Sequence, residues 1–192
     1  MTETGEAVLS EKEELILDAV LAVLSRGGIA AVSMRAVAKE ADVALGLMNY
    51  YFDGKTSLIA AALRRLGEED ALLVAPIDGL EPAEQVRHAL RRVADEEFLR
   101  TDDLGLRLHL WSLAPIEPTF AEINNHAQRQ YRDGLAALIA RARPDLSPAE
   151  IGRRAADILV IQNGMWLTSI LIVDTESIER SVERCEAIAF AP

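Results

Sequence analysis

The segment of residues 33–55, SMRAVAKEADVALGLMNYYFDGK, constrains the fold more than any other part of the 192-residue chain. Val37 and Ala41 lie four residues apart, the spacing of one apolar face of a helix. Asp42 interrupts that pattern, and a second short helical segment, residues 44–52, follows at once. Two short helices joined by three or four residues predict a helix-turn-helix, the geometry that lays its second helix in the major groove of DNA.

The rest of the chain predicts an all-α protein. Ala, Leu, Arg and Glu are abundant, and strand-forming residues do not gather in alternating runs. We expect about nine helices in two domains: a three-helix domain at residues 1–54, with a disordered acidic arm at residues 1–9, and a larger helical domain at residues 55–192. Besides the two short helices, the expected helices are residues 10–26, 55–73, 82–100, 104–113, 119–142, 148–173 and 176–189.

The distribution of charge matters more for DNA binding than the net charge of −11. Residues 1–25 hold six acidic residues and one lysine, whereas residues 26–65 hold six basic residues and three acidic ones. The predicted helix-turn-helix is therefore the locally basic part of an acidic protein. We expect a modest and strongly salt-sensitive affinity for DNA in each subunit, because ionic contacts to phosphates weaken as salt rises.

Several classes of protein lack support in the sequence. There is no G-x-S-x-G, phosphate loop or H-E-x-x-H motif, so we expect no catalytic residues, no enzyme activity and no cofactor. The three histidines have no ligand spacing and there is no cysteine cluster, so we expect no metal site. The single cysteine, Cys185, fits a reducing cytoplasm. The longest apolar run, residues 165–173, is too short to span a bilayer, and the acidic start is unlike a signal peptide, so we expect no membrane partner.

One known family carries the same residues in the helix-turn-helix. The matching residues are Val37-Ala38-Lys39-Glu40-Ala41-Asp42-Val43, Gly46, Tyr50-Tyr51-Phe52, Lys55 and Leu58. Over about residues 15–63 the chain resembles the TetR-type one-component transcriptional regulators, and residues 46–52 resemble the branch of choline-responsive betaine regulators. The resemblance implies a homodimer that binds double-stranded operator DNA, with a pocket for a small-molecule effector in each larger domain. Repression is the usual output of the family.

Nine residues are candidates for DNA binding: Ser33, Arg35, Ala44, Leu45, Gly46, Asn49, Tyr50, Tyr51 and Lys55. Ser33 can offer a phosphate its hydroxyl and nearby backbone N–H groups, or it can be a plain N-cap. Arg35 can read a guanine edge or remain solvated, and Asn49 can read adenine. The resemblance implies that Tyr51 donates its hydroxyl to a phosphate. Lys55 begins the next helix and is expected to contact a phosphate through its charge.

Three further positions in this segment need interpretation. Asp42 stands where the family usually has glycine in the turn. Aspartate tolerates a left-handed backbone better than most residues, but its negative charge near DNA is expected to weaken binding slightly. Leu47 and Met48 lie between the two faces of the second helix, and at least one of them is expected in the core.

The predicted helix at residues 148–173 is apolar nearly all round, which indicates burial on both sides. One side would face the core of its own chain and the other a second copy across a two-fold axis. The alternative is a central helix of a monomeric bundle. The candidate dimer residues are Ala156, Leu159, Val160, Leu167, Ile170 and Leu171.

Aromatic and polar residues of the larger domain are candidates for the effector pocket: Phe98, His109, Trp111, Asn125, Tyr131, Gln162, Asn163 and Trp166. Gln162 and Asn163 interrupt an apolar helix, and a buried amide needs partners from a ligand, the core or a dimer interface. Trp111, Tyr131 and Trp166 could form an aromatic cage for a quaternary ammonium, or pack in an ordinary core.

A helical adaptor without DNA binding is the alternative to a regulator. The combination Tyr50-Tyr51-Phe52 with Lys55 argues against it, because an adaptor has no need of phosphate donors at these positions. For a regulator, the helix at residues 55–73 joins the two domains and is the expected lever between effector and DNA.

Overall fold

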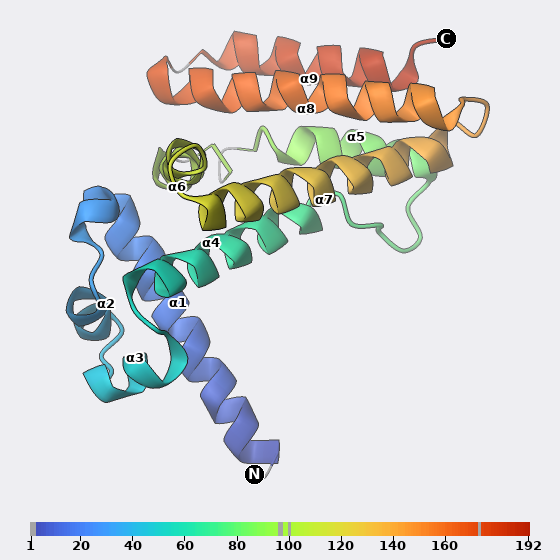
Figure 1. The fold of residues 1–192 in the computed structure, drawn as a ribbon. Coiled ribbons are helices and arrows are strands. Elements are labelled where there is room, and N and C mark those ends of the chain that lie inside the picture. Colours follow the sequence, from blue (N-terminus) through green and yellow to red (C-terminus); the bar gives the residue numbers. More distant parts are fainter. Residues whose placement is uncertain (1–2, 96–97, 100, 173) are drawn as a thin grey trace. The chain divides into compact units, whose positions relative to one another are not determined.

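The computed structural model describes residues 3–95, 98–99, 101–172 and 174–192, without the side chains of residues 3–10, 101–103 and 110. Over these residues the chain is all-α and contains no strand, which confirms the predicted fold class. The helices, drawn in Figure 1, are α1 (Glu3–Ala31), α2 (Met34–Glu40), α3 (Leu45–Tyr51), α4 (Lys55–Leu72), α5 (Pro82–Arg92), α6 (Thr101–Leu113), α7 (Pro118–Ala142), α8 (Pro148–Leu171) and α9 (Thr175–Phe190).

The helices form two compact units. The first consists of the chain up to Leu66 together with His109–Ile123, and the second of Gly67–Leu108 together with Asn124–Pro192. The predicted helix-turn-helix domain, residues 1–54, lies entirely within the first unit. Helices α4, α6 and α7 each contribute residues to both units.

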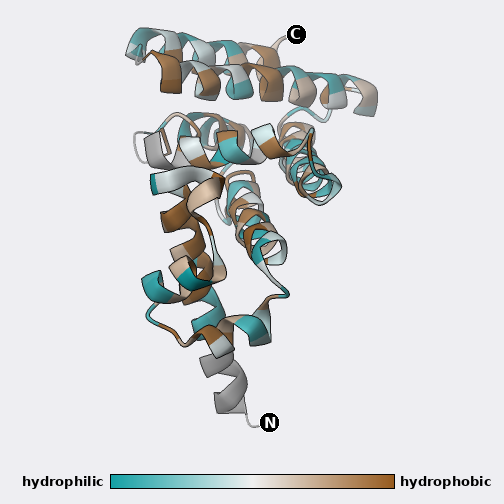
Figure 2. Ribbon diagram, turned by 60° about the vertical axis from the view of Figure 1, so that its left-hand side comes forward, coloured by the Kyte–Doolittle hydropathy of each residue, from teal (hydrophilic) through white to brown (hydrophobic). Residues whose placement is uncertain are grey.

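The core of the first unit is formed where α1, α2, α3 and the start of α4 come together. Figure 2 shows the brown, hydrophobic stretches of α1 that contribute to it. Its buried side chains include Ile16, Val20, Leu24, Val37, Met48, Leu58 and Leu63. Met48 is fully buried and Leu47 is half-buried, so the core residue expected between the faces of α3 is Met48.

Helix α1 differs from its prediction at both ends. It begins at Glu3, upstream of residue 10, where the sequence predicted its start. At its other end the helix runs past residue 26, where its end was predicted: it kinks at Gly28, with φ 64° and ψ −171°, and continues to Ala31.

The second unit is built around α8 and α9, which run side by side in opposite directions (Figure 1). Helix α5 packs on α9. Ser147 caps α8, because its hydroxyl accepts the N–H of Glu150 at 3.2 Å. The prediction for α5 was too long: the helix ends at Arg92 rather than near residue 100. The carbonyl of Val93 accepts the indole N–H of Trp166 at 3.0 Å, a bond that anchors the chain where the helix stops.

Candidate DNA-binding and effector sites

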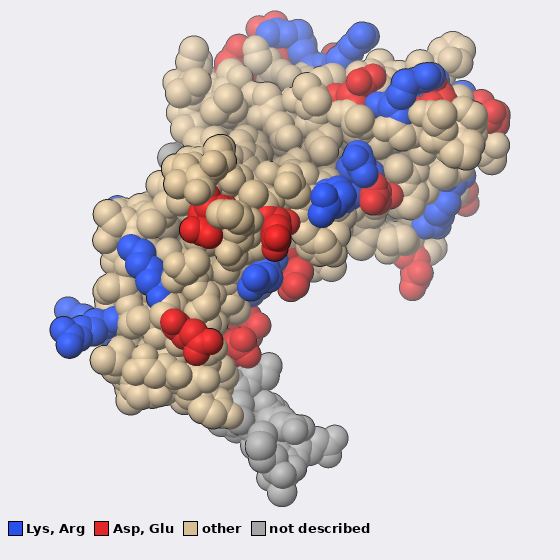
Figure 3. All heavy atoms as spheres, viewed as in Figure 1, with Lys and Arg blue, Asp and Glu red and all other residues tan. Residues whose placement is uncertain are grey.

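Helix α2 starts at the residue that the sequence indicated. The Ser33 hydroxyl accepts the backbone N–H of Ala36 at 3.1 Å, which confirms Ser33 as the N-cap. Arg35 and Lys39 lie on this helix and are exposed, and Figure 3 shows basic side chains (blue) projecting at the left over α2. The exposed guanidinium of Arg35 is therefore accessible to a phosphate or a base edge.

The turn between α2 and α3 depends on Asp42. Its φ of 51° is the only positive value of a non-glycine residue in the described chain. The N–H of Val43 bonds to the carbonyl of Ala38 at 2.9 Å and closes the turn. The expected tolerance of aspartate for the left-handed conformation is confirmed, and the turn fixes the direction in which α3 leaves.

Helix α3 buries Met48 and exposes most of the predicted DNA-binding residues. These exposed residues are Ala44, Leu45, Gly46, Asn49 and Tyr50. A Cβ placed on Gly46 would meet no heavy atom within 4 Å, so this part of the helix is open to an incoming surface. A DNA backbone can approach a glycine more closely than any other residue. The exposed face thus combines a close-approach position with one amide, Asn49, that can read a base edge.

Tyr51 is held more firmly than its neighbour. Its ring meets that of Tyr50 edge-on at 5.2 Å between centroids and lies 6.0 Å from the ring of Phe52. Loss of hydration raises the pKa of Tyr51, and the nearby charge of Glu13 raises it further. The hydroxyl therefore stays protonated at neutral pH, which is the form that can donate to a phosphate.

Lys55 has a structural role that the sequence did not reveal. Its ammonium donates a hydrogen bond of 2.6 Å to the carbonyl of Ile29, just after the kink in α1. The ammonium is exposed and has three protons, so the bond to Ile29 leaves donors for a phosphate. The contact sets the position of the predicted phosphate anchor relative to α1.

Two of the six basic residues between residues 26 and 65 brace the first unit. Arg26 forms a two-pronged pair with Glu40, at 3.0 and 2.6 Å, which joins α1 to α2. Arg65 bonds to Glu14 at 2.9 Å and to Asp18 at 2.6 Å, which joins α4 to α1. The Arg26–Glu40 pair already cancels within the count for residues 26–65, but the partners of Arg65 lie outside that range, so the count overstates the basic charge offered to DNA.

Only some of the candidate effector residues lie close to one another. In the second unit the rings of Phe98 and Trp166 lie 5.4 Å apart. The guanidinium of Arg107, which the sequence did not single out, lies over both rings, at 4.2 and 5.4 Å. Arg107 is buried and paired with Asp70 of α4. These four residues form a charged and aromatic cluster inside the unit.

Polar side chains of α7 and α8 are also buried in the second unit. Gln162 is 1% exposed, and neither of its amide atoms has a hydrogen-bond partner among the described residues. The hydroxyl of Tyr131 is also buried and makes no hydrogen bond of normal geometry with these residues. Burial raises the pKa of Tyr131, and a weaker hydrogen-bonding interaction with the Gln162 side chain lowers it. Asn163 donates to Gln128 at 3.2 Å. Four buried polar atoms here, Tyr131 Oη, Gln162 Nε2 and Oε1, and Asn163 Oδ1, lack partners.

The remaining candidates lie elsewhere. His109 and Trp111 belong to the first unit, whereas Tyr131 and Trp166 belong to the second, so the structure does not assemble the predicted three-ring cage within one unit. Asn125 is exposed. In the described part of the chain no group of three potential metal-binding residues occurs, and no helix there is long and apolar enough to cross a membrane.

Comparison with known proteins places these features in one family. Residues 16–62 match the model for bacterial regulatory proteins of the tetR family, and residues 82–189 match the model for the C-terminal part of BetI-type transcriptional repressors. The chain belongs to the TetR family. It is therefore a DNA-binding transcriptional regulator, and the resemblance seen in residues 33–55 is confirmed.

Relatives extend over most of the chain. The HTH-type transcriptional repressor KstR of Rhodococcus jostii is 31% identical over 165 residues, which cover 82% of this chain and 74% of that protein. The HTH-type transcriptional regulator BetI of Burkholderia thailandensis is 24% identical over 160 residues, which cover 81% of this chain and 80% of that protein. A TetR regulator structure from Haloarcula marismortui matches with a TM-score of 0.82 at 22% identity, covering 95% and 98%. The structure of a putative transcriptional regulator from Saccharomonospora viridis in complex with choline matches with a TM-score of 0.74 at 18% identity, covering 92% of this chain and 94% of that one.

In this TetR-family chain, α8 presents an apolar face without a partner in the single protomer. Val160 is 71% exposed, Leu167 45% and Leu171 73%. The other candidate dimer residues, Ala156, Leu159 and Ile170, are half-buried. An exposed aliphatic row of this size on one helix is typical of a surface that another protein covers.

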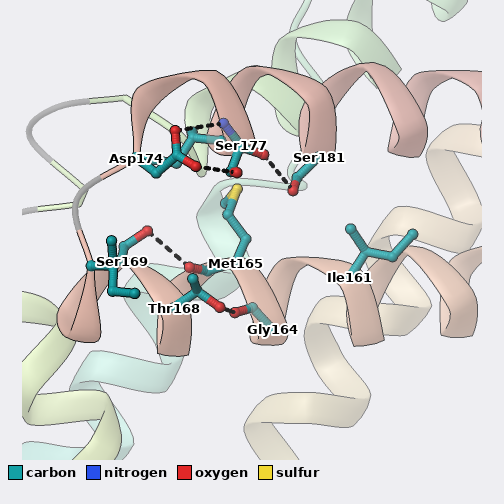
Figure 4. Close-up of a pocket in the computed structure, with 10 residues that line it drawn as sticks. Ile161, Gly164, Met165, Thr168, Ser169, Asp174, Ser177 and Ser181 are labelled. Atoms are coloured by element: carbon teal, nitrogen blue, oxygen red, sulfur yellow. Dashed lines mark hydrogen bonds between the residues drawn. The ribbon is translucent and has the colours of Figure 1, made fainter.

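The TetR-family chain also has a hollow of 310 Å³ between the end of α8 and the start of α9, shown in Figure 4. Its hydroxyl groups are used within their own helices: Thr168 donates to the carbonyl of Gly164 and Ser169 to that of Met165, both at 2.8 Å. Asp174 caps α9 by accepting the backbone N–H of Ser177. Hydrogen bonds from the Ser177 hydroxyl and from this N–H lower the pKa of Asp174. The hollow thus offers a ligand fewer unpaired polar groups than the Gln162 cluster.

Proposed function

We propose that this TetR-family regulator is a repressor that binds a palindromic operator as a homodimer in the cytoplasm and leaves it when a small molecule binds the second unit. The observation that carries the proposal is the exposed face of α3. Gly46 and Asn49 lie on that face, and two candidate phosphate anchors, Tyr51 and Lys55, follow on the C-terminal side. Base readers flanked by phosphate donors are the arrangement by which a helix-turn-helix reads DNA.

The dimer is proposed to form through the apolar face of α8. Val160 and Leu171 are mostly exposed in the protomer and would be covered by a second copy. Two recognition helices about 34–36 Å apart would then reach successive major grooves. A small molecule that binds better to a protomer shape with another spacing would shift the population away from DNA. The buried thiol of Cys185 is compatible with a reducing cytoplasm.

Selection of DNA from a random pool by the purified full-length protein tests the proposal. We expect an inverted repeat whose half-sites are centred about 10 base pairs, or a multiple of this, apart. Recovery of no common sequence would favour the helical adaptor instead. As a matched control, the Tyr51→Phe, Lys55→Ala double variant should lose affinity for all sequences about equally, because phosphate contacts carry no sequence information. Asn49→Ala should instead relax the selected sequence at one position of each half-site.

A further inference from the structure

The inference concerns the chemical class of the effector and rests on the proposed function. The aromatic surface in the second unit already holds a cation of the chain itself. The Arg107 side chain is 8% exposed, and its guanidinium carbon lies 4.2 Å from the ring centre of Phe98 and 5.4 Å from that of Trp166. A quaternary ammonium would have to displace Arg107 from these rings or bring a second positive charge beside it.

The partner of Arg107 is less firmly buried. Asp70 accepts the Nε–H of Arg107 at 3.1 Å and a second bond from Nη2, and its side chain is 18% exposed. A displaced Asp70 can regain water at this edge, whereas a displaced Arg107 would have to leave a buried aromatic surface. Exchange of the carboxylate partner is therefore easier than exchange of the cation, and the site favours an incoming anion.

The charged cluster is continuous with the polar atoms that lack partners. Gln162 precedes Trp166 by four residues on α8, so both side chains lie on the same face, one turn apart. Gln162 is close enough to Tyr131 to lower its pKa, and the charge of Asp70 acts on Tyr131 in the opposite direction. Arg107 contacts both Asp70 and Trp166, Gln162 lies one helical turn from Trp166, and Tyr131 interacts with Gln162. A ligand that supplies hydrogen bonds would satisfy the amide and the hydroxyl.

We propose that the effector is an organic carboxylate that replaces Asp70 as the partner of Arg107 and hydrogen-bonds to Gln162 and Tyr131. Its hydrocarbon part would lie along the Phe98 and Trp166 rings. A planar guanidinium binds a carboxylate with two parallel hydrogen bonds, so the new pair reproduces the geometry of the old one.

The exchange would act directly on α4. Asp70 lies near the C-terminal end of this helix, and Lys55 is its first residue. When the effector takes Arg107, α4 loses the ion pair that anchors its C-terminal end in the second unit. The same helix carries a predicted phosphate anchor at its other end, so the ligand exchange and DNA release involve one continuous helix.

Matched ligands test the charge of the effector. The experiment uses the full-length Trp111→Phe variant, in which Trp166 is the only tryptophan. This parent protein is titrated with straight-chain carboxylates, primary amides and alkyltrimethylammonium ions of equal chain length, up to dodecyl. Thermal unfolding and Trp166 fluorescence are the readouts. We expect at least one carboxylate to raise the Tm and change the emission more than its amide or ammonium counterpart. Arg107→Gln should weaken that carboxylate at least about tenfold, the value of one charge-assisted contact.

Two more variants separate binding from folding. Gln162→Leu removes the unpaired amide, so its Tm without ligand should be at least that of the parent while carboxylate binding weakens. Arg92→Gln removes an exposed arginine of α5 and should leave carboxylate binding unchanged. Any one of three results overturns the inference. The first is that every carboxylate raises the Tm of Arg107→Gln at least as much as it raises the Tm of the parent. The others are that an ammonium ion binds as tightly as its matched carboxylate, or that Gln162→Leu binds the carboxylate as tightly as the parent does.

Operator binding by the ligand-free protein distinguishes this inference from the proposed function. A protein that selects an inverted repeat but ignores every carboxylate would refute the effector class alone. A protein that selects no DNA would refute the repressor itself, whatever it binds.

Discussion

The ammonium of Lys55 donates a hydrogen bond to the carbonyl of Ile29 at 2.6 Å, so the residue that begins α4 also fastens the end of α1. The contact lies immediately after the kink at Gly28, where the helical hydrogen-bond pattern of α1 is interrupted. A lysine with both a backbone partner and exposed protons can position itself and still bind an anion.

Replacement of Lys55 by alanine should therefore have two effects. We expect a loss of about 0.5–1.5 kcal/mol in the free energy of unfolding from the lost hydrogen bond. We also expect weaker binding to all DNA sequences, with the slope of log affinity against log salt reduced by about 1. Chemical denaturation and fluorescence anisotropy at several salt concentrations measure the two effects. Arg141→Ala, an exposed substitution on α7, is the control and should change neither. An unaltered salt slope in Lys55→Ala would remove Lys55 from the phosphate contacts.

Two glycines of the first unit should respond to alanine in opposite ways. Gly28 has φ 64° and ψ −171°, a conformation that is almost confined to glycine, so Gly28→Ala should destabilise the protein by about 1–3 kcal/mol. Gly46 lies in α3, and a Cβ there meets nothing within 4 Å. Gly46→Ala should therefore stabilise the free protein by up to about 1 kcal/mol, because alanine favours a helix.

DNA binding provides the second readout for Gly46. If this glycine allows α3 to approach the DNA backbone closely, Gly46→Ala should bind its operator more weakly despite its higher stability. Thermal unfolding and operator titration of the same preparations measure both properties. Equal or tighter operator binding by Gly46→Ala would show that no close approach occurs at this position.

The proposed dimer face makes a prediction about oligomeric state. Leu171→Glu places a charge where a second copy would bury an aliphatic side chain, so it should shift the protein to monomers and weaken operator binding at low protein concentration. Ile116→Glu is a matched control, since Ile116 is 78% exposed but lies between α6 and α7. Light scattering coupled to gel filtration gives the molar mass. A dimeric Leu171→Glu protein with full operator affinity would place the interface elsewhere.

The thiol of Cys185 should be a sensitive reporter of unfolding. Burial raises its pKa to about 12, so at pH 8 almost none of it is the reactive thiolate. We expect a coloured disulfide reagent to react slowly with the native protein and rapidly with the protein in denaturant. The raised pKa means that folding favours the protonated thiol. Its contribution to stability is present below pH 9 and is lost as the pH rises toward 12.

Short-range features of the helix-turn-helix were predictable because their causes lie within a few residues. The Ser33 cap needs only the N–H of Ala36, and the left-handed turn at Asp42 is closed by a bond between Val43 and Ala38. The order of apolar residues then indicates which side of α3 is buried. Only the choice between Leu47 and Met48 required the packed structure.

The effector cluster was only partly predictable because its partners are distant in sequence. Arg107 pairs with Asp70 across 37 positions, and the end of α5 is tied to Trp166 across 73 positions. A charged residue on a helix is most often exposed to solvent, so the sequence pattern alone does not predict the burial of Arg107. Amide residues inside an apolar helix gave a clearer signal, and Gln162 is indeed buried without partners.

The left-handed aspartate also bears on how easily a repressor can be switched off. Asp42 keeps a negative charge beside the helix that is proposed to enter DNA, in a position that glycine could occupy with less backbone strain. A tighter operator complex needs a higher effector concentration to dissociate, because DNA and effector favour opposite states of the same conformational equilibrium. Asp42→Gly should therefore yield a regulator that silences its genes more completely and responds only at higher effector concentration. In the proposed repressor, the carboxylate of Asp42 would make repression less complete and induction easier.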